Sequence, residues 1–345
     1  MKLLSVIGTR PQSIKMNMIL KSLWLFPEIQ HKYVWTGQHY DENMSQLFID
    51  TLGMPNPDIC LGIGRNKYAE LPNQASQHSY YRTMTEILIA EQPDVVMVYG
   101  DCNSTWLAAE SAYMLSIPVA HIEAGCRSGE DTLEEKNRIL TDRISTYNFA
   151  PTITCYNNLE RERVNAHLVG DVMYDSYLYY QEKISSITPV IDVEILLTIH
   201  RPDNDDIEYI ESIFSELAHD GRKVFFPVHP RIDKTMKDCS IEVPDNIETA
   251  GPIDYFGTQV LLRVVDEVWT DSGGLEREAY FANKKTNSLR IVSEWTNDIE
   301  NRHSFGDGKA ARRILSILQQ KEIPNKENRL YQGTCSEGLV AIRDL

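Results

Sequence analysis

Short apolar segments rich in Val, Ile and Tyr alternate with longer segments of helical character through the first half of the chain. Each short segment ends at Gly, Thr or an acidic residue, a pattern typical of buried strands. The expected strands are Leu3–Ile7, Tyr33–Thr36, Val95–Tyr99 and Pro118–Ile122. The expected helices open at Pro11, span Ser79–Glu91 and begin after Asn103 or Ser104. Such a series favours a parallel sheet that is covered by helices on both faces.

A second series of the same kind follows, and a length of 345 residues suits two domains. Its expected strands are Glu194–Ile199, Lys223–Val228 and Glu267–Thr270. Its expected helices are Ile207–Leu217, Tyr255–Val264 and Leu275–Phe281. We therefore predict an α/β fold with two Rossmann-like domains that face one another across a cleft, which is a favoured place for ligands.

The boundary between the domains is expected in the segment that separates the two series. We assign residues 1–172 to the first domain and residues 173–330 to the second. The helix-like segment Asp175–Ile184 would bridge them. We also expect the last residues, 330–345, to pack back on the first domain.

Composition narrows the classes of partner. The 34 basic and 50 acidic side chains give a net charge of −16, so an extended nucleic-acid surface is not expected. A nucleotide needs only a few local cations or a helix N-terminus. No apolar run approaches the roughly 18 residues of a membrane span. The six cysteines form no C-x-x-C pair, which favours reduced thiols of a cytoplasmic protein over a disulfide framework or a metal site for zinc.

Acidic side chains follow the expected strands of the first domain. Asp101 comes after one strand and a glycine, and Glu123 directly ends the next. Ligands of open α/β sheets bind at the carboxyl ends of strands, so both are candidate acid/base groups, together with Glu134. Simpler interpretations stay open: Asp101 as part of a helix cap, and Glu134 in a helical ion pair with Arg138. His121, on a strand, is expected to be structural.

Cationic segments at other strand ends are candidate anion sites. The segment Gly8–Lys15 opens a helix, whose free N–H groups and dipole favour an anion, and it carries Arg10 and Lys15. His200 and His229 each follow a strand of the second domain, where a histidine can hold phosphate oxygens. An ordinary strand–helix turn and plain loop histidines are the open alternatives.

The segment Thr270–Glu278 has the most specific form. A strand ends, Ser272, Gly273 and Gly274 make a turn, and a helix starts. The glycines allow the backbone to approach a diphosphate, and Glu278 could accept hydrogen bonds from ribose hydroxyls. The phosphate-binding Lys of a Walker loop and the G-x-G-x-x-G pattern are both missing from the sequence, which disfavours ATP hydrolysis and dinucleotide redox chemistry.

Taken in order, these segments resemble the UDP-N-acetylglucosamine 2-epimerase family over most of the chain. The matching segments are Gly8–Lys15, Thr36–Asp41, Tyr99–Asp101, His121–Gly125, Glu134–Arg138, His200–Arg201 and Asp271–Glu278. Three further segments are most similar to the branch that includes epimerases of UDP-2,3-diacetamido-2,3-dideoxyglucuronate. They are Leu61–Gly64, Val228–Arg231 and Ser293–Trp295.

The resemblance implies a glycosyltransferase-B-like pair of domains without NAD or a catalytic metal. It implies a UDP-sugar substrate, with UDP mainly on the second domain and the sugar facing the first, and a homodimer. Asp101, Glu123 and Glu134 match the family's acid/base carboxylates, and His200 completes the catalytic set. The residues implied to bind the diphosphate, the sugar and UDP are Arg10, Lys15, Arg138, His229, Ser272, Gly273, Gly274 and Glu278, with His200 beside them.

The implied reaction is epimerisation at C2 without hydrolysis. UDP leaves C1, a carboxylate removes the C2 proton to give a 2-acetamidoglycal, and re-addition gives the other isomer. Two alternatives stay open: a hydrolysing epimerase that releases UDP and ManNAc, and a UDP-sugar-binding protein without catalysis. Altered loops motivate the second, since Leu133 stands where proline is usual and the preceding loop Ser128–Thr132 is short. Asn297 stands where the branch often has glutamate, which leaves the identity of the sugar open.

Overall fold

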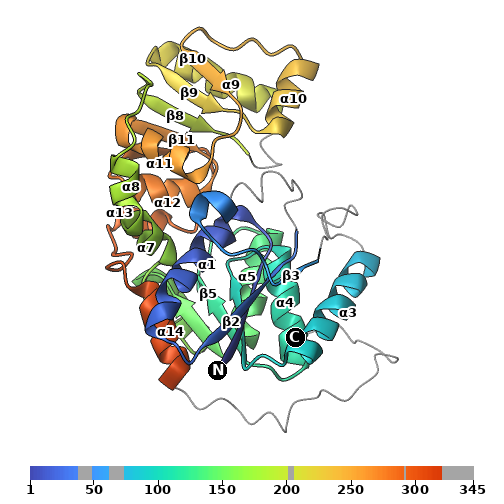
Figure 1. Ribbon diagram of the computed structural model, residues 1–345. Coiled ribbons are helices and arrows are strands. Elements are labelled where there is room, and N and C mark those ends of the chain that lie inside the picture. Colours follow the sequence, from blue (N-terminus) through green and yellow to red (C-terminus); the bar gives the residue numbers. More distant parts are fainter. Residues whose placement is uncertain (38–48, 62–73, 201–205, 291–292, 321–345) are drawn as a thin grey trace.

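The computed structural model describes residues 1–37, 49–61, 74–200, 206–290 and 293–320, and only the backbone of residues 74–78. Within these residues the chain forms two α/β domains, one beyond the other along the length of the molecule (Figure 1). All strand pairs in both sheets are parallel. The prediction of two Rossmann-like domains is confirmed.

The first domain is built on a seven-stranded sheet in the order β3-β2-β1-β4-β5-β6-β7. Its strands are β1 (Lys2–Ile7), β2 (Gln30–Trp35), β3 (Ile59–Cys60), β4 (Val95–Tyr99), β5 (Val119–Ile122), β6 (Tyr147–Ala150) and β7 (His167–Leu168). Its helices are α1 (Arg10–Ser22), the 3-10 turn η1 (Leu23–Leu25), α3 (Gln74–Glu91), α4 (Asn103–Met114), α5 (Leu133–Ile144) and α6 (Ile153–Arg161). The four expected strands and three expected helices are all present, and β2 and α3 begin earlier than expected.

Alternating side chains of β1 explain why helices cover both faces of this sheet. Leu3 and Ile7 belong to the core on the side of α1, whereas Leu4 and Val6 belong to the core under α3 and α4. All four are almost fully buried. Because successive side chains of a strand point to opposite faces, a strand that is apolar at nearly every position needs a layer of helices on each side.

The second domain repeats this plan with a five-stranded sheet in the order β10-β9-β8-β11-β12. Its strands are β8 (Ile195–Thr198), β9 (Val224–Pro227), β10 (Ile247–Ala250), β11 (Glu267–Thr270) and β12 (Lys285–Ser288). Its helices are α9 (Ile207–Asp220), α10 (Pro230–Asp238), α11 (Tyr255–Val264) and α12 (Gly273–Phe281). The three expected strands and three expected helices are again present.

Four helices connect or follow the domains: α7 (Val172–Tyr179), α8 (Gln181–Ser185), α13 (Thr296–Glu300) and α14 (Ala310–Gln320). The last of them returns to the first domain, where it packs on α1 and α7 (Figure 1). Asp175 caps α14, because its carboxylate accepts hydrogen bonds from the amides of Ala310 and Ala311 at 3.1 and 2.8 Å.

The expected bridge Asp175–Ile184 falls on α7 and α8. The boundary between residues 172 and 173 stays a prediction, because α7 contacts both α1 of the first domain and α12 of the second. The expectation that residues 330–345 pack back on the first domain lies outside the described residues.

The sequence patterns did not predict β3, β6, β7, β10 or β12. These strands have two to four residues and few adjacent apolar ones, whereas β5, β8 and β9, which are also four residues long, lie within longer apolar stretches that the sequence reveals. Four of them form the outer edges of the two sheets. Pairing with a neighbouring strand, rather than their own composition, therefore decides that they are strands.

Each sheet changes its winding direction at one position, and both positions carry candidate site residues. In the first sheet this switch lies between β1 and β4, which are followed by Gly8 and Asp101. In the second it lies between β8 and β11, which are followed by His200 and Ser272. Ligands of open α/β sheets bind at such switch points. The strand order thus selects one end of each sheet for the site.

We expect Gly125→Ala to destabilise the first domain strongly. Gly125 has a φ of +81°, and an added Cβ would lie 2.2 Å from the carbonyl oxygen of Cys155. A backbone oxygen cannot move aside as a flexible side chain can, so the loss should be about 3 kcal/mol or more. Urea denaturation measures it.

Gly129→Ala is the matched control. Gly129 has a similar φ of +75°, but an added Cβ would meet nothing within 4 Å. The unfavourable backbone conformation alone should cost about 1 kcal/mol. Equal losses in the two variants would contradict a specific role for the contact between Gly125 and Cys155.

Candidate active site

Side chains from both domains meet where the carboxyl ends of the two sheets face each other. Arg277 of α12 reaches Glu123, which follows β5, and Glu294, which follows β12, reaches Arg138 of α5. The four side chains are between 3% and 12% exposed. Ion pairs therefore join the domains where the sequence predicted a cleft.

Glu123 is the centre of one group of charges. Its Oε1 lies 2.8 Å from Nζ of Lys15 and its Oε2 lies 2.8 Å from Nη1 of Arg277. Its backbone has a φ of +69°, which is uncommon for a residue with a side chain. Burial raises the pKa of Glu123, but Arg277 and Lys15 outweigh burial and lower it to about 2. Glu123 is therefore an ionised carboxylate held between one cation from each domain.

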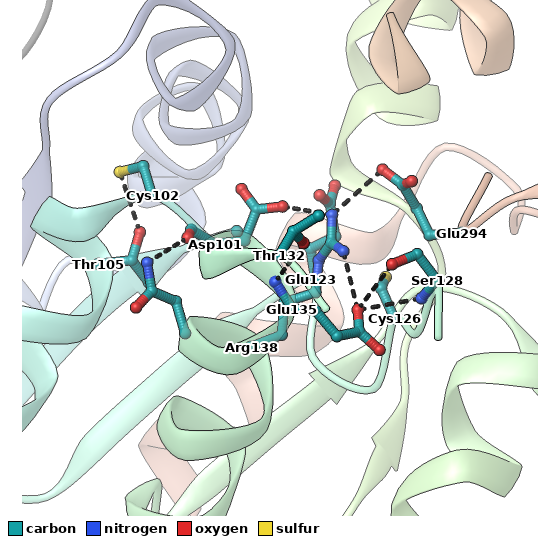
Figure 2. Close-up of polar contacts among 12 residues, drawn as sticks. Asp101, Cys102, Thr105, Glu123, Cys126, Ser128, Thr132, Glu135, Arg138 and Glu294 are labelled. Atoms are coloured by element: carbon teal, nitrogen blue, oxygen red, sulfur yellow. Dashed lines mark hydrogen bonds and ion pairs between the residues drawn. The ribbon is translucent and has the colours of Figure 1, made fainter. Parts of the chain in front are cut away.

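Arg138 is the centre of the second group (Figure 2). Its guanidinium forms ion pairs with Asp101, with Glu135 at 3.1 Å and with Glu294 at 3.2 Å. Glu294 also accepts a hydrogen bond from Arg290 at 2.7 Å. Burial raises the pKa of Glu294, yet Arg138 and Arg290 together lower it to about 2. Three carboxylates thus share two buried arginines.

The structure places Glu134 outside this group. It is exposed in the first turn of α5, whereas Glu135 is buried and accepts hydrogen bonds from the amides of Ser128 and Gly129 at 3.0 and 3.1 Å. One residue along a helix is a rotation of about 100°, so neighbouring side chains point in different directions. Arg138 pairs with Glu135, three residues before it, rather than with Glu134, which was the simpler interpretation left open by the sequence. An acid/base role for Glu134 stays a prediction.

The simpler interpretations of Asp101 and His121 have different outcomes. Asp101 does not cap α4, because Cys102 is the N-cap residue and the Asp101 carboxylate pairs with Arg138 of α5. His121 is fully buried, with Nδ1 2.7 Å from Oδ1 of Asp142 and Nε2 2.8 Å from the carbonyl oxygen of Gly100. The expectation of a structural histidine is confirmed.

Two backbone amides at the start of α1 are already used within the protein. The N–H groups of Gly8 and Thr9 donate to Oε1 of Gln12 at 2.7 and 3.2 Å. The expectation that free amides hold an anion here is therefore wrong for these two groups. Arg10, which is half-buried, and Lys15 remain the candidate cations of this segment.

The two candidate histidines of the second domain are both exposed. Nδ1 of His200 lies 2.6 Å from Oδ1 of Asp271, a fully buried carboxylate. This contact orients the ring and leaves Nε2 for a ligand. His229 instead caps α10, where its Nδ1 accepts a hydrogen bond from the amide of Arg231 at 3.3 Å. Arg231 donates to the carbonyl of His200, so the two loops are linked.

The turn that opens α12 is a helix N-terminus built around Ser272. The Oγ of Ser272 accepts a hydrogen bond from the amide of Leu275 at 3.3 Å. Only glycine fits at Gly273 without a shift of its neighbours, because an added Cβ would lie 2.6 Å from Oε1 of Glu294. With Gly273 and Gly274 in the first turn, the helix start can approach an anion closely, and its dipole favours one.

Glu278 lies one turn further along α12 and is buried. Its Oε2 accepts a hydrogen bond from Nε2 of Gln259 at 2.8 Å. Burial raises the pKa of Glu278 to about 7, although Arg277 and the bond from Gln259 act in the opposite direction. The charge of Glu278 therefore changes near neutral pH.

The sequence patterns did not indicate Arg277, Glu294 or Glu135. Arg277 and Glu294 lie inside segments that were singled out for other residues. Their contacts join positions 154 and 156 residues apart, and no local spacing indicates such a pair. For Glu135, only the rotation of α5 decides which of two adjacent glutamates is buried.

Two other kinds of site find no support in the part of the chain that the structure describes. No group of three His, Cys, Asp or Glu side chains there could hold a metal ion. No helix among the described residues combines the length and apolar character needed to cross a membrane.

Comparison with known proteins shows that the chain is similar to enzymes of nucleotide sugars. The family described as UDP-N-acetylglucosamine 2-epimerase matches residues 23–304. A UDP-N-acetylglucosamine 2-epimerase homolog of Methanococcus maripaludis is 36% identical over 99% of this chain and 98% of its own. The UDP-2,3-diacetamido-2,3-dideoxy-D-glucuronate 2-epimerase of Pseudomonas aeruginosa is 34% identical over 86% of this chain and 85% of its own.

A solved structure shows the same fold over nearly the whole chain. The Methanocaldococcus jannaschii UDP-GlcNAc 2-epimerase, crystallised in complex with UDP-GlcNAc and UDP, matches with a TM-score of 0.85 at 31% identity. The match covers 93% of this chain and 100% of that one.

We expect Glu278→Gln to stabilise the protein without ligand at neutral pH. The folded state keeps the Glu278 proton up to about pH 7, whereas the unfolded chain releases it near 4.5. Ionisation of Glu278 therefore lowers the free energy of unfolding. This loss is absent below pH 4.5 and reaches its full size above pH 7. Glutamine resembles the protonated form, so the free energy of unfolding should rise by about 1–3 kcal/mol near pH 7.5 and hardly at all near pH 4.

Glu267→Gln is the matched control. Burial raises the pKa of Glu267, but Arg222 and Lys285 pair with it and lower the pKa below its ordinary value. The same substitution should therefore destabilise the protein near neutral pH. Urea denaturation of both variants at about pH 4 and about pH 7.5 tests the pair. A gain for Glu278→Gln that is equal at both pH values would contradict the role given to ionisation.

Proposed function

The chain belongs to the UDP-N-acetylglucosamine 2-epimerase family, and we propose that it epimerises a UDP-2-acetamido sugar at C2 without net hydrolysis. The observation that carries the proposal is the position of Glu123. This carboxylate, whose side chain is 12% exposed, lies at the junction of the domains, where Lys15 and Arg277 keep it ionised.

The two switch points suggest how the substrate is divided between the domains. The helix start at Ser272 and the exposed ring of His200 suit a diphosphate on the second domain, with Glu278 one turn further for the ribose. The sugar would then face the first domain, where Glu123 and Asp101 lie. We propose further contacts for the other basic residues predicted from the sequence: Arg10, Lys15, Arg138 and His229.

The chemistry requires this combination of charges. The C2 proton of the sugar is not acidic in the bound substrate. As UDP leaves C1, positive charge develops on the ring, and C2 becomes acidic enough for a carboxylate to remove the proton. Cations around the diphosphate stabilise the departing UDP. A carboxylate that stays ionised beside the ring stabilises the developing positive charge.

The intermediate is then a 2-acetamidoglycal. Delivery of a proton to the other face of C2 and return of UDP to C1 give the epimer. Asp101, Glu123 and Glu134 are the candidates for the two proton transfers, with His200 beside the leaving group. The relatives suggest two substrates, UDP-GlcNAc and UDP-2,3-diacetamido-2,3-dideoxyglucuronate. We also propose that the protein is cytoplasmic, as its cysteines indicated, and that it is a homodimer, as the resemblance implied.

We expect the purified protein in D2O to incorporate deuterium at C2 of one of these two UDP-sugars and to form its epimer. Glu123→Gln should lower the exchange rate by about 10²–10⁴-fold. The substitution removes the carboxylate that takes the C2 proton or stabilises the positive charge on the sugar ring. Binding of UDP should remain. Proton NMR time courses and isothermal titration calorimetry measure the two quantities.

Glu86→Gln is the control, because Glu86 is exposed on α3 and pairs there with Arg82. Its exchange rate should equal that of the wild type. Accumulation of free UDP and ManNAc would indicate the hydrolysing reaction instead. Tight binding of both UDP-sugars with neither exchange nor epimer would contradict the proposal and favour a binding protein.

A further inference from the structure

Arg277 connects the helix proposed to hold the nucleotide with the carboxylate proposed to act on the sugar. We propose that Arg277 is a positioning residue, which sets the orientation and the charge of Glu123 when the two domains are together. This inference rests on the proposed function, in which Glu123 takes part in the chemistry at C2. Nothing in the sequence motifs assigned a role to Arg277.

The guanidinium of Arg277 is held on two sides. Its Nη1 lies 2.8 Å from Oε2 of Glu123 and 2.8 Å from Oδ2 of Asp171. Its central carbon lies 4.1 Å from the ring centroid of Trp295, which is 1% exposed. A planar guanidinium that stacks on a buried indole and bridges two carboxylates has little freedom to rotate. Arg277 can therefore hold the Glu123 carboxylate in one orientation.

The contact exists only while the domains are together. Arg277 belongs to α12 of the second domain, whereas Glu123 and Lys15 belong to the first. Ser272, which caps the same helix, is five residues away, or about 7.5 Å along the helix axis. One short helix thus carries both the turn proposed for UDP and the cation that meets Glu123. If the domains separate, Glu123 keeps Lys15 alone.

The charges that face Glu123 come from three elements. Lys15 projects from α1, Arg277 from α12, and Asp171 stands just before α7. The two cations and the two carboxylates balance. The neighbouring thiol of Cys126 is buried, which raises its pKa and keeps it neutral. Loss of Arg277 would leave two buried carboxylates with one lysine, and a proton would bind to the pair.

A charge-balanced variant isolates the effect on Glu123. Asp171→Asn/Arg277→Gln removes one charge of each sign and leaves the pair of Glu123 with Lys15. Asp171→Asn alone is the matched control, since it keeps Arg277 beside Glu123. Asp171→Asn/Arg277→Lys tests rescue by a cation. Arg222→Gln, at the opposite end of the second sheet, controls for the loss of an arginine ion pair in general.

Two measurements report the pH at which Glu123 becomes ionised. One is carbon NMR titration of its carboxyl group in the protein without ligand, assigned by the signal missing from Glu123→Gln. The other is the pH dependence of kcat and KM for deuterium exchange at C2. In the Asp171→Asn/Arg277→Gln variant, we expect titration about one to three pH units higher than in Asp171→Asn, and an acid limb of kcat that moves with it.

We expect kcat of the doubly substituted variant to fall about 10- to 100-fold with KM changed less than about threefold, because orientation is lost while the nucleotide contacts remain. In the Asp171→Asn/Arg277→Lys variant, Glu123 should again titrate at the low pH seen in Asp171→Asn. Unchanged titration and an unchanged acid limb, with effects confined to KM or thermal stability, would overturn the inference. If the doubly substituted variant does not fold, the single variant Arg277→Lys is the test, because lysine keeps the positive charge but not the planar guanidinium. A normal kcat would overturn the inference. A reduced kcat with an unchanged acid limb of the pH profile would support it.

The two proposals can fail separately. Wild-type protein that binds the UDP-sugars without exchange at C2 would contradict the proposed function. The NMR titration needs no turnover and would still show whether Arg277 sets the charge of Glu123.

Discussion

Buried ion pairs cross the junction between the two domains. Glu123 of the first domain is paired with Arg277 of the second, and Arg138 of the first with Glu294 of the second. A buried charge without its partner costs several kcal/mol. Either domain alone would have to expose these groups to water or change their protonation. The packing of the two domains against each other therefore assembles these ion pairs.

A buried network of hydrogen bonds and an ion pair around Asp142 stabilises the turn that carries Glu123. Asp142 of α5 contacts His121 through Oδ1 and accepts a hydrogen bond from the amide of Gly125 at 3.1 Å through Oδ2. Arg127 pairs with the same Oδ2 at 2.8 Å. A non-glycine residue with positive φ needs such support, because its conformation is unfavourable by itself. The structural histidine of β5 thus serves the site indirectly, through the backbone that presents Glu123.

Much of the fold could be predicted because it depends on local patterns. The expected strands and helices of both domains are present, and the strands that were missed are short and carry few adjacent apolar residues. The candidate site was predicted in part. Glu123 and Asp101 lie at strand ends, as expected, and both are paired with buried arginines. Glu134 was chosen by its place in a motif, but rotation of α5 turns Glu135 inward instead.

The sequence by itself determined the α/β class, the two domains and the strand ends at which carboxylates and glycines gather, since hydrophobic period and turn residues are properties of neighbouring positions. Only the tertiary structure decided which charges meet. Arg277 and Glu294 find their partners more than 150 residues away, and such contacts follow from strand order and domain packing rather than from spacing. The same packing keeps Glu123 ionised, because a pKa depends on the burial and the charges that surround a group in space.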